Sequence, residues 1–320
     1  MKRVAVLTSG GDAPGMNAAI RAVVRSAIYE GMEVFGVYRG FEGLISGQYE
    51  KLSPGSVADI IHRGGTILHT SRSKDFMQTQ GRARAREHMA RLGIDSLVII
   101  GGNGSMRGGY ELVSESDGVQ VIGIPATIDN DVVYTRSIGY DTAVNTALSA
   151  INNIRDTATS HGRVFIIEVM GRRCGEIALA AGVGGGAESI LIPEIEPDIG
   201  QVISKIKSGT ERGKLHSIII VAEGVYPVMT LKDEIMAATG RDTRVSILGH
   251  VQRGGTPTAI DRILASYMGK AAIDAILRGK SNVMVAGQDD RFYTIPLGEV
   301  INGHRTPDLG MFEIARILST

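Results

Sequence analysis

The fold is decided by the stretch Leu97-Val98-Ile99-Ile100-Gly101-Gly102-Asn103-Gly104-Ser105. Its first four residues are apolar and rich in β-branched side chains, which is typical of a strand buried on both faces. The glycines that follow allow a tight turn, and we expect the next segment to open a helix. A buried strand, a glycine-rich turn and a helix in this order indicate an α/β fold with a parallel sheet.

The same pattern recurs along the chain. Segments such as Asn17–Tyr29 and Asp261–Leu277 have helical periodicity and lie between short apolar runs. The further runs are Val4–Leu7, Val34–Val37, Val121–Ile124, Val164–Val169, Ile190–Ile192, Ile218–Ala222 and Val283–Ala286. Strands that alternate with helices predict an α/β protein with largely parallel sheets.

Composition excludes several classes of protein. Lys+Arg and Asp+Glu are both 34, so the global basic excess expected of a nucleic-acid binder is missing. Cys174 is the one cysteine, which rules out an intrachain disulfide and fits a reducing compartment. Val4–Leu7 is too short for a signal-peptide core, and no stretch approaches the roughly 20 apolar residues of a membrane span. We therefore expect a cytoplasmic protein of about two domains, with no nucleic-acid or membrane partner.

Glycine-rich or polar segments follow five of the apolar runs. They are Thr8–Asn17, Gly101–Ser105, Pro125–Asp131, Met170–Arg172 and Glu223–Gly224. Ligands of open α/β sheets bind at the carboxyl ends of the strands. We therefore expect these five segments to converge on one sheet edge and to form a ligand site there.

The Gly101–Ser105 loop suits phosphate, because glycine lets backbone N–H groups approach an anion and a helix N-terminus adds partial positive charge. A tight strand–helix turn without a ligand is the alternative. The dinucleotide fingerprint is absent, since Gly102–Met106 continues with Arg107 where a glycine is needed. A Walker loop is absent as well, since Gly279–Ser281 has Asp274 at the position of the first glycine.

Several long motifs occur together, and through them the chain resembles the bacterial 6-phosphofructokinases over essentially its whole length. The motifs are Gly10–Asn17, Gly101–Ser105, Thr127–Asp131, Met170–Arg172 and Gly249–Gly255. The resemblance implies two doubly wound α/β lobes. An ATP-binding lobe would comprise residues 1–139 plus 252–304, and a fructose 6-phosphate-binding lobe residues 140–251 plus 305–320. It also implies a homotetramer with substrate sites at one interface and effector sites at another.

The implied reaction transfers a phosphoryl group from Mg-ATP to the 1-hydroxyl of fructose 6-phosphate, giving fructose 1,6-bisphosphate and ADP. Asp129 matches the family's catalytic base, and Thr127 and Asp131 flank it. Arg172 matches an arginine that approaches the γ-phosphoryl group, where a permanently charged guanidinium suits the developing charge. From the residues alone, the Thr-x-Asp-x-Asp run also fits a helix-capping loop or a hard-cation site. The implied ATP-binding residues are Gly11, Arg72, Ser73, Gly102, Asn103, Gly104, Ser105 and Gly108.

The resemblance also implies a cationic clamp for the sugar phosphate. His250 and Arg253 match ligands within one subunit, and Arg163 and Arg244 match ligands from the neighbouring subunit. Glu223 matches a carboxylate that binds sugar hydroxyls. The remaining substrate positions are Thr127, Asp129, Met170, Gly171 and Arg172.

A second basic group matches the family's effector site, which binds ADP as activator and phosphoenolpyruvate as inhibitor. Arg21 and Arg25 are four residues apart on one predicted helix, so they face the same way. A solvated helix face is the alternative for these two. The full set is Arg21, Arg25, Arg155, Gly186, Glu188, Arg212 and Lys214.

Four residues depart from the family pattern. Asn103 stands where the family has an aspartate associated with Mg²⁺, so we expect Asn103 at the metal with weaker metal use or lower turnover. Ala126 replaces a glycine; pyrophosphate-dependent relatives have a lysine there and an acidic residue at Gly104. Pro54 and Met77 replace basic residues. Two alternatives stay open, a pyrophosphate-dependent phosphofructokinase and a low-activity regulatory paralogue that binds sugar phosphate.

Overall fold

The computed structural model describes residues 2–115, 118–288 and 291–319. The chain divides into two compact units, each with its own sheet. The larger unit runs to Thr142 and adds Arg253–Arg305, and the smaller comprises Ala143–Gln252 and the residues from Thr306 onward. The binding of ATP by one lobe and of fructose 6-phosphate by the other stays a prediction.

The larger unit contains a seven-stranded sheet in the order β11-β10-β5-β4-β1-β2-β3. The inner pairs are parallel, whereas β3 pairs antiparallel with β2, and β11 antiparallel with β10. The strands are β1 (Arg3–Ser9), β2 (Glu33–Val37), β3 (Tyr49–Leu52), β4 (Ser96–Gly101), β5 (Gln120–Pro125), β10 (Val283–Gln288) and β11 (Arg291–Pro296). The largely parallel α/β sheet that the sequence predicts is therefore confirmed.

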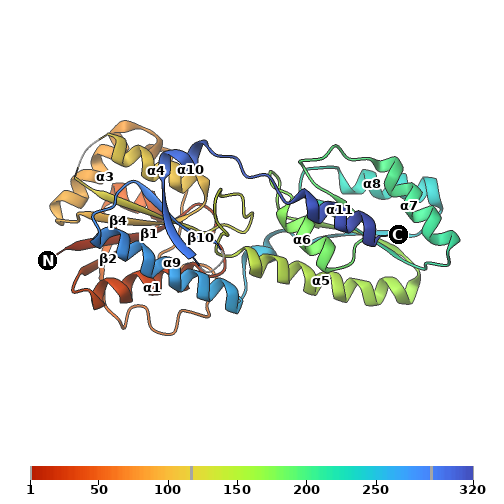
Figure 1. Ribbon diagram of the computed structural model, residues 1–320, viewed down its shortest axis with the longest axis horizontal. Helices are drawn as coiled ribbons and strands as arrows, with labels where there is room; N and C mark the ends of the chain where they lie inside the picture. Colours follow the sequence, from red (N-terminus) through yellow and green to blue (C-terminus); the bar gives the residue numbers. More distant parts are fainter. Residues whose placement is uncertain (1, 116–117, 289–290, 320) are drawn as a thin grey trace. The chain divides into compact units, whose positions relative to one another are not determined.

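Helices cover both faces of this sheet (Figure 1). The paired helices α1 (Met16–Tyr29) and α9 (Ala259–Leu277) lie on one face. Their backbones approach closely, because a Cβ on Gly269 would lie only 2.5 Å from the Cβ of Ala22. The other face carries α2 (Gly40–Ser46), the short turn η1 (Asp75–Met77), α3 (Thr79–Arg91), α4 (Asn103–Ser114) and α10 (Leu297–Asn302).

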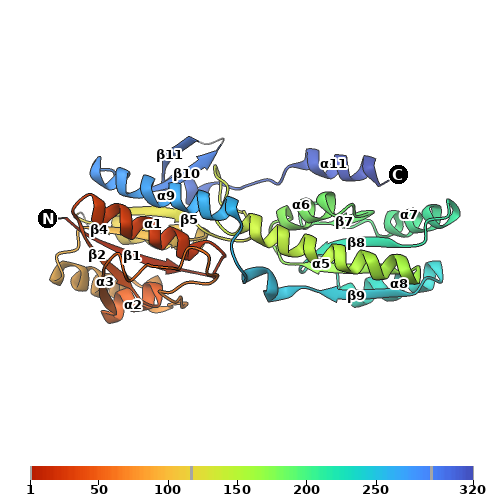
Figure 2. The same cartoon turned by 90° about the horizontal axis from the view of Figure 1, so that it is seen from below.

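The smaller unit contains a four-stranded, wholly parallel sheet in the order β7-β8-β6-β9. Its strands are β6 (Val164–Val169), β7 (Ser189–Leu191), β8 (Ser217–Ala222) and β9 (Thr243–Ile247), and η2 (Gly249–Arg253) follows β9. An apolar core joins α7 (Ile199–Glu211) and α8 (Val228–Thr239) to the sheet. The last helix, α11 (Leu309–Leu318), packs on α6 (Glu176–Gly184) and β7 (Figure 2). The long helix α5 (Tyr140–His161) precedes β6.

Two sequence expectations need correction. The five ligand loops do not share one sheet edge: three follow β1, β4 and β5 of the larger sheet, and two follow β6 and β8 of the smaller. The sequence also missed β3, β9 and β11, which are all edge strands. An edge strand is only partly buried and therefore lacks a continuous apolar run. Within the described ranges, no helix combines the length and apolarity needed to cross a bilayer.

Candidate active site

Three loops meet at the carboxyl ends of β1, β4 and β5. In the strand order, β1 lies between β4 and β2, so successive connections leave in opposite directions and open a crevice at the strand ends. The hydroxyl of Ser105 donates to the main-chain oxygen of Ser9 at 3.0 Å, which ties the β4 loop to the β1 loop. A Cβ on Gly101 would lie 2.4 Å from that same oxygen, so only glycine fits there.

The β4 loop leads directly into a helix, as the sequence predicts. Helix α4 begins at Asn103, and Gly102 precedes it as the N-cap residue. Thr127, in the β5 loop, lies close to this turn, because a Cβ on Gly102 would be 3.5 Å from the Cβ of Thr127. The first N–H groups of a helix have no partner within the helix and carry partial positive charge. The crevice therefore presents the helix start beside the β5 loop.

A cavity of about 550 Å³ occupies this crevice of the larger unit. Its lining includes ten residues that the sequence assigned to ATP or substrate: Gly11, Arg72, Ser73, Gly102, Gly104, Ser105, Gly108, Thr127, Asp129 and Arg253. Ala126 lies there too, whereas Asn103 is not part of the lining. The structure thus brings together, in one space, glycine-rich loops that the sequence predicted to bind phosphate, three arginines (Arg72, Arg107 and Arg253) and two carboxylates (Glu111 and Asp129).

An aromatic pair that the sequence reasoning missed forms part of the cavity wall. The rings of Phe41 and Phe76 stack with centroids 4.0 Å apart and planes 18° apart. Gly108 lies against them, since a Cβ at this position would be 2.8 Å from two ring atoms of Phe41. The hydroxyl of Ser73 accepts a hydrogen bond from the backbone N–H of Phe76 at 3.3 Å. This flat apolar wall suits an aromatic ring, and its only sequence signal was the scarcity of phenylalanine, six in the chain.

The loop that carries Asp129 is held from within. Asn130 has a left-handed backbone, with φ 52°, and is 2% exposed. Its side-chain oxygen accepts from the N–H of Ser137 at 2.9 Å. The hydroxyl of Thr127 accepts from the N–H of Asp129 at 3.3 Å, and the N–H of Thr127 donates to Ile138. These bonds hold the loop so that half-buried Asp129 lines the cavity.

Asn103 and Asp131 contact each other beside this loop. The side-chain N–H₂ of Asn103 donates to the Asp131 carboxylate at 3.0 Å and to its main-chain oxygen at 3.2 Å. Within the described residues, no group of three or more His, Cys, Asp or Glu side chains is arranged to hold a metal. Mg²⁺ is usually held by one or two carboxylates, with substrate phosphates and waters completing the shell. The Asp131 carboxylate is one such ligand, and Asn103 presents its amide nitrogen, not its oxygen, to that carboxylate.

In the smaller unit, Arg172 and Glu223 form an ion pair at the ends of β6 and β8. Their charged atoms are 2.5 Å apart, and the Arg172 side chain is 70% exposed. The adjoining Gly171 has φ 116°, a conformation that favours glycine. The N–H of Met170 donates to the side-chain oxygen of Gln252 at 2.8 Å. Gln252 is fully buried and was missed, although it lies inside the Gly249–Gly255 motif.

Asp242 links Arg163 and Arg244, the two arginines predicted to reach a neighbouring subunit. Its carboxylate lies 2.6 Å from Nε of Arg163 and 3.2 Å from Nε of Arg244. Burial raises the pKa of Asp242, but the hydrogen bonds from both arginines outweigh it and bring the pKa below the usual value. Sequence reasoning missed Asp242, because a lone acid between two arginines has no spacing signature.

His250 and Arg253, predicted as one anion pair, belong to different units of the chain. His250 is exposed in η2 of the smaller unit. Arg253 begins the second segment of the larger unit, and its guanidinium lies against Gly11, where a Cβ would be 2.4 Å from Nη1. The guanidinium donates to the main-chain oxygen of Asp12 at 3.4 Å. Their joint role in binding a sugar phosphate stays a prediction.

Part of the predicted effector set forms a cluster in the smaller unit. Lys214 pairs with Glu188 at 2.6 Å, and Glu188 also accepts from the N–H of Ile218 at 2.5 Å. Arg155 donates to the main-chain oxygen of Gly186 at 3.0 Å. It also lies 3.4 Å from His216, a residue that the sequence reasoning missed. Burial lowers the pKa of His216, although nearby Glu188 opposes this.

The other predicted effector residues are less engaged. Arg21 and Arg25 lie on α1 of the larger unit, and Arg212 follows α7. In the part of the chain that the structure describes, none of these three arginines forms an ion pair. Their role at an effector site stays a prediction.

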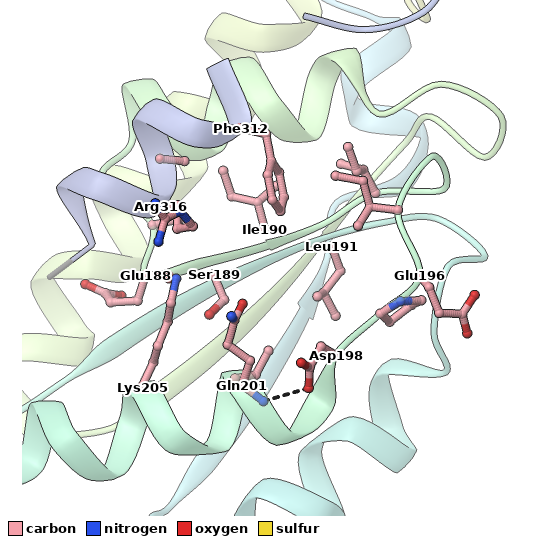
Figure 3. A pocket seen from close by; sticks show the side chains of 16 residues that line it. Glu188, Ser189, Ile190, Leu191, Glu196, Asp198, Gln201, Lys205, Phe312 and Arg316 are labelled. Carbon is pink, nitrogen blue, oxygen red and sulfur yellow. Dashed lines mark hydrogen bonds between the residues drawn. The ribbon is translucent and has the colours of Figure 1, made fainter. Parts of the chain in front are cut away.

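A separate cavity of about 210 Å³ lies beside edge strand β7, between α7 and α11 (Figure 3). Lys205 extends toward Glu188 and donates to its main-chain oxygen at 3.0 Å. Burial and the neighbouring Arg316 lower the pKa of Lys205, while Glu188 raises it. Phe312 of α11 covers the apolar part of the cavity. Lys205 also donates to the hydroxyl of Ser319, the residue that follows α11, at 2.9 Å, so it connects the end of the last helix to the backbone of a predicted effector residue.

Comparison with known proteins identifies the family. Residues 3–276 match the profile of the family described as Phosphofructokinase. The chain belongs to the phosphofructokinase family. It is 53% identical, over the full length of both chains, to the ATP-dependent 6-phosphofructokinase of Natranaerobius thermophilus, and 52% identical to that of Bacillus subtilis. Phosphofructokinase from Saccharomyces cerevisiae superimposes with a TM-score of 0.87 and 35% identity, over 94% of this chain and 45% of the yeast chain.

Proposed function

We propose that this chain is an ATP-dependent 6-phosphofructokinase, which transfers the γ-phosphoryl group of Mg-ATP to the 1-hydroxyl of fructose 6-phosphate. The observation that carries the proposal is the cavity of the larger unit, where phosphate-binding loops and Asp129 line one space. Full-length relatives at 52–53% identity with that name support it. Fructose 1,6-bisphosphate and ADP are the products.

The cavity wall favours a nucleotide over pyrophosphate as donor. The stacked Phe41 and Phe76 offer a flat apolar surface for an aromatic base, which pyrophosphate lacks. Ala126 is buried in the wall and carries no charge, unlike the lysine implied for pyrophosphate users. Gly104 is equally small, and a Cβ there would meet no atom within 4 Å. The pyrophosphate-dependent alternative therefore has no residue in this cavity that supports it.

In this proposal Asp129 acts as general base and accepts the proton of the attacking hydroxyl. A general base contributes on the order of 10²–10⁴ in rate when it is correctly placed. Thr127 holds the loop through its bond to the Asp129 N–H, and Asp131 shapes the outer end of the loop. Arg172 is the guanidinium proposed to neutralise charge on the transferred phosphoryl group. Its side chain is 70% exposed and pairs with Glu223, which leaves guanidinium donors available for that role.

Mg²⁺ supplies neutralisation of the phosphate charge when it is bound with ATP. Asp131 would hold it through its carboxylate, and Asn103 would do so through its amide oxygen only after its N–H₂ has released Asp131. The single formal charge of this pair supports weaker metal binding than two carboxylates would give. The assignment of these two residues to the metal is our proposal, whereas the use of ATP and Mg²⁺ is general in the family.

The sugar phosphate, the effectors and the assembly complete the proposal. Arg163, Arg244 and His250 would bind the 6-phosphate together with Arg253, and Glu223 the sugar hydroxyls. ADP or phosphoenolpyruvate would act at the cluster of Arg155, Glu188 and Lys214, completed by Arg21, Arg25, Gly186 and Arg212. We propose a homotetramer, as the family resemblance implies, and a cytoplasmic location; arginines that serve a neighbouring subunit require at least a dimer.

A coupled assay for fructose 1,6-bisphosphate tests the function directly. Purified protein is given fructose 6-phosphate with either ATP or pyrophosphate across a Mg²⁺ series. We expect turnover with ATP and less than one hundredth of that rate with pyrophosphate. The reverse preference would establish the pyrophosphate-dependent alternative. Binding of fructose 6-phosphate without turnover of either donor would establish the regulatory paralogue.

A further inference from the structure

Asn103 makes a two-point contact with the residue at the end of the catalytic loop. Its amide nitrogen donates to both the side-chain and the main-chain oxygen of Asp131, at 3.0 and 3.2 Å. Asn103 is the first residue of α4, so this contact ties the loop after β5 to a rigid helix. A bond to the main chain as well as to the side chain fixes the position of residue 131 and the direction of its carboxylate.

The loop therefore has two anchors, with Asp129 between them. The inner anchor is buried Asn130, which binds the N–H of Ser137. The outer anchor is the amide of Asn103, on the more exposed side of the loop. The outer anchor is the one that contacts the carboxylate of Asp131, the proposed oxygen ligand of the metal.

The chemistry of the outer anchor depends on Asn103 being an amide. An amide donates through N–H₂, whereas an ionised carboxylate only accepts. Aspartate at this position would place two negative charges about 3 Å apart with no proton between them, a strongly repulsive arrangement. Two such carboxylates need a cation to hold them together. Asparagine needs none, because its own N–H₂ occupies the place of the bridging charge.

We infer that Asn103 is a positioning residue that anchors Asp131, and with it the Asp129 loop, without a bound cation. The same amide removes one negative charge from the metal site, so the loop is ordered before Mg-ATP arrives and free Mg²⁺ adds little to that order. The importance of the loop rests on the proposed function, but the anchoring itself is independent of catalysis.

Four proteins test this inference in a cycle: wild type, Asn103→Asp, Asp131→Asn and the double variant that exchanges the two residues. Thermal melts are recorded in EDTA and in millimolar MgCl₂. In EDTA we expect Asn103→Asp to melt about 2–4 °C below wild type, which corresponds to about 1 kcal/mol in a protein of this size. The exchange variant should regain most of the wild-type melting temperature, because it restores one amide and one carboxylate with the donor reversed.

The response to Mg²⁺ separates positioning from a general loss of stability. We expect Mg²⁺ to raise the melting temperature of Asn103→Asp back to that of wild type or above, while wild type moves by less than about 1 °C. The Mg²⁺ concentration at half effect should be about tenfold lower for Asn103→Asp than for the exchange variant, because the aspartate pair carries twice the charge.

Equal melting of wild type and Asn103→Asp in EDTA, with equal responses to Mg²⁺, would overturn the inference. If Asn103→Asp does not fold in EDTA, a folded exchange variant supports the inference, and an exchange variant that is also unfolded overturns it. Failure of the proposed function would be seen separately, as wild-type protein that forms no fructose 1,6-bisphosphate while the melting results stand.

Discussion

Two arginine–carboxylate contacts, one in each unit, show how burial decides what an arginine does. In the larger unit, the Arg82 side chain is 8% exposed and binds Glu111, Glu115 and the main-chain oxygen of Phe76. In the smaller unit, Arg172 is 70% exposed, and Glu223 is its one ion-pair partner among the described residues. The first guanidinium is fully used inside the fold, whereas the second has donors to spare. Removing one partner of a buried pair leaves an unpaired buried charge and destabilises the fold, whereas an exposed pair contributes little to stability.

The two units also differ in the kind of group that each would offer to a phosphate. In the proposed function, the larger unit would bind phosphate through backbone N–H groups at glycine turns, which need no counter-charge when the site is empty, together with Arg72 and Arg253. The smaller unit presents guanidiniums that are already held by acids, Arg163 and Arg244 by Asp242 and Arg172 by Glu223. A ligand phosphate at such arginines must compete with the acid beside it. We therefore expect binding at the smaller unit to respond more strongly to salt and pH.

Among the arginine variants, the largest effect should come from removing the exposed guanidinium of Arg172. Arg172→Ala is expected to lower kcat about 100-fold, because a donor to the transition-state charge is lost, while the melting temperature stays within about 1 °C. Arg173, the next residue, is equally exposed and serves as the matched control. Arg173→Ala should keep kcat within about twofold. Equal losses of kcat in Arg172→Ala and Arg173→Ala would contradict a specific catalytic role for Arg172.

Removal of an arginine held by Asp242 should act on substrate affinity. Arg163→Ala and Arg244→Ala are each expected to raise KM for fructose 6-phosphate about 10–30-fold, with kcat changed by less than about threefold, since charged hydrogen bonds contribute about 1.5–3 kcal/mol. Steady-state kinetics at varied fructose 6-phosphate measure the split. Lys207→Ala, an exposed lysine of α7, is the control. A fall in kcat at unchanged KM would show that these arginines act in the chemical step and not in the binding of fructose 6-phosphate.

Glu115→Gln, which breaks the pair between Arg82 and Glu115, should lower the free energy of unfolding and leave activity unchanged. The hydrogen bond from Arg82 is the main cause that lowers the pKa of Glu115 to about 2. A carboxylate with a lowered pKa adds stability above its unfolded pKa and loses it as the pH falls toward the folded value. Glu115→Gln should therefore cost about 2 kcal/mol of unfolding free energy near pH 7. The difference from wild type should shrink between about pH 5 and pH 2.

Urea denaturation at several pH values measures this difference. Glu87→Gln is the matched control, because the Glu87–Arg91 pair is exposed on both sides and should contribute less than about 0.5 kcal/mol. A loss for Glu115→Gln that is constant from pH 7 to pH 2 would contradict the assignment of the effect to the ionised carboxylate.

The smallest effect concerns the aromatic wall of the cavity. In Gly108→Ala the new methyl group would press on the ring of Phe41, at 2.8 Å, and displace the stacked pair. We expect KM for ATP to rise about fivefold, which is about 1 kcal/mol, with KM for fructose 6-phosphate unchanged. Initial rates at varied ATP give both values. An unchanged KM for ATP would mean that the nucleotide base does not use this wall.

Sequence predicted those parts of the molecule that local pattern determines. Inner strands such as β4 and β5 are buried on both faces and therefore read as continuous apolar runs, whereas β3, β9 and β11 at the edges do not. The Thr127–Asp131 loop was predicted through the family resemblance, and the structure places Thr127 and Asp129 in the lining of the cavity; their catalytic role stays a prediction. The stacked Phe41 and Phe76, by contrast, are far apart in the chain and meet only through folding.

Acids that pair with the arginines of predicted function could not be assigned from the sequence either. Asp242 acts on Arg163, which is 79 residues away, so no spacing rule could connect them. Gln252 lies inside a recognised motif, but its contact with the backbone of Met170 depends on the fold. The expectation of one shared sheet edge was wrong for a related reason, since apolar runs do not reveal to which sheet each strand belongs.

The most direct test of the account measures Asp129→Asn for turnover and for ligand binding together. Asparagine keeps the size of the side chain but cannot accept the proton of the sugar hydroxyl. We predict a kcat about 1,000-fold below wild type. Titration calorimetry should meanwhile show affinities for ATP and fructose 6-phosphate within about threefold of wild type. A variant that retains more than about a tenth of the wild-type kcat would contradict the assignment of Asp129 as the base.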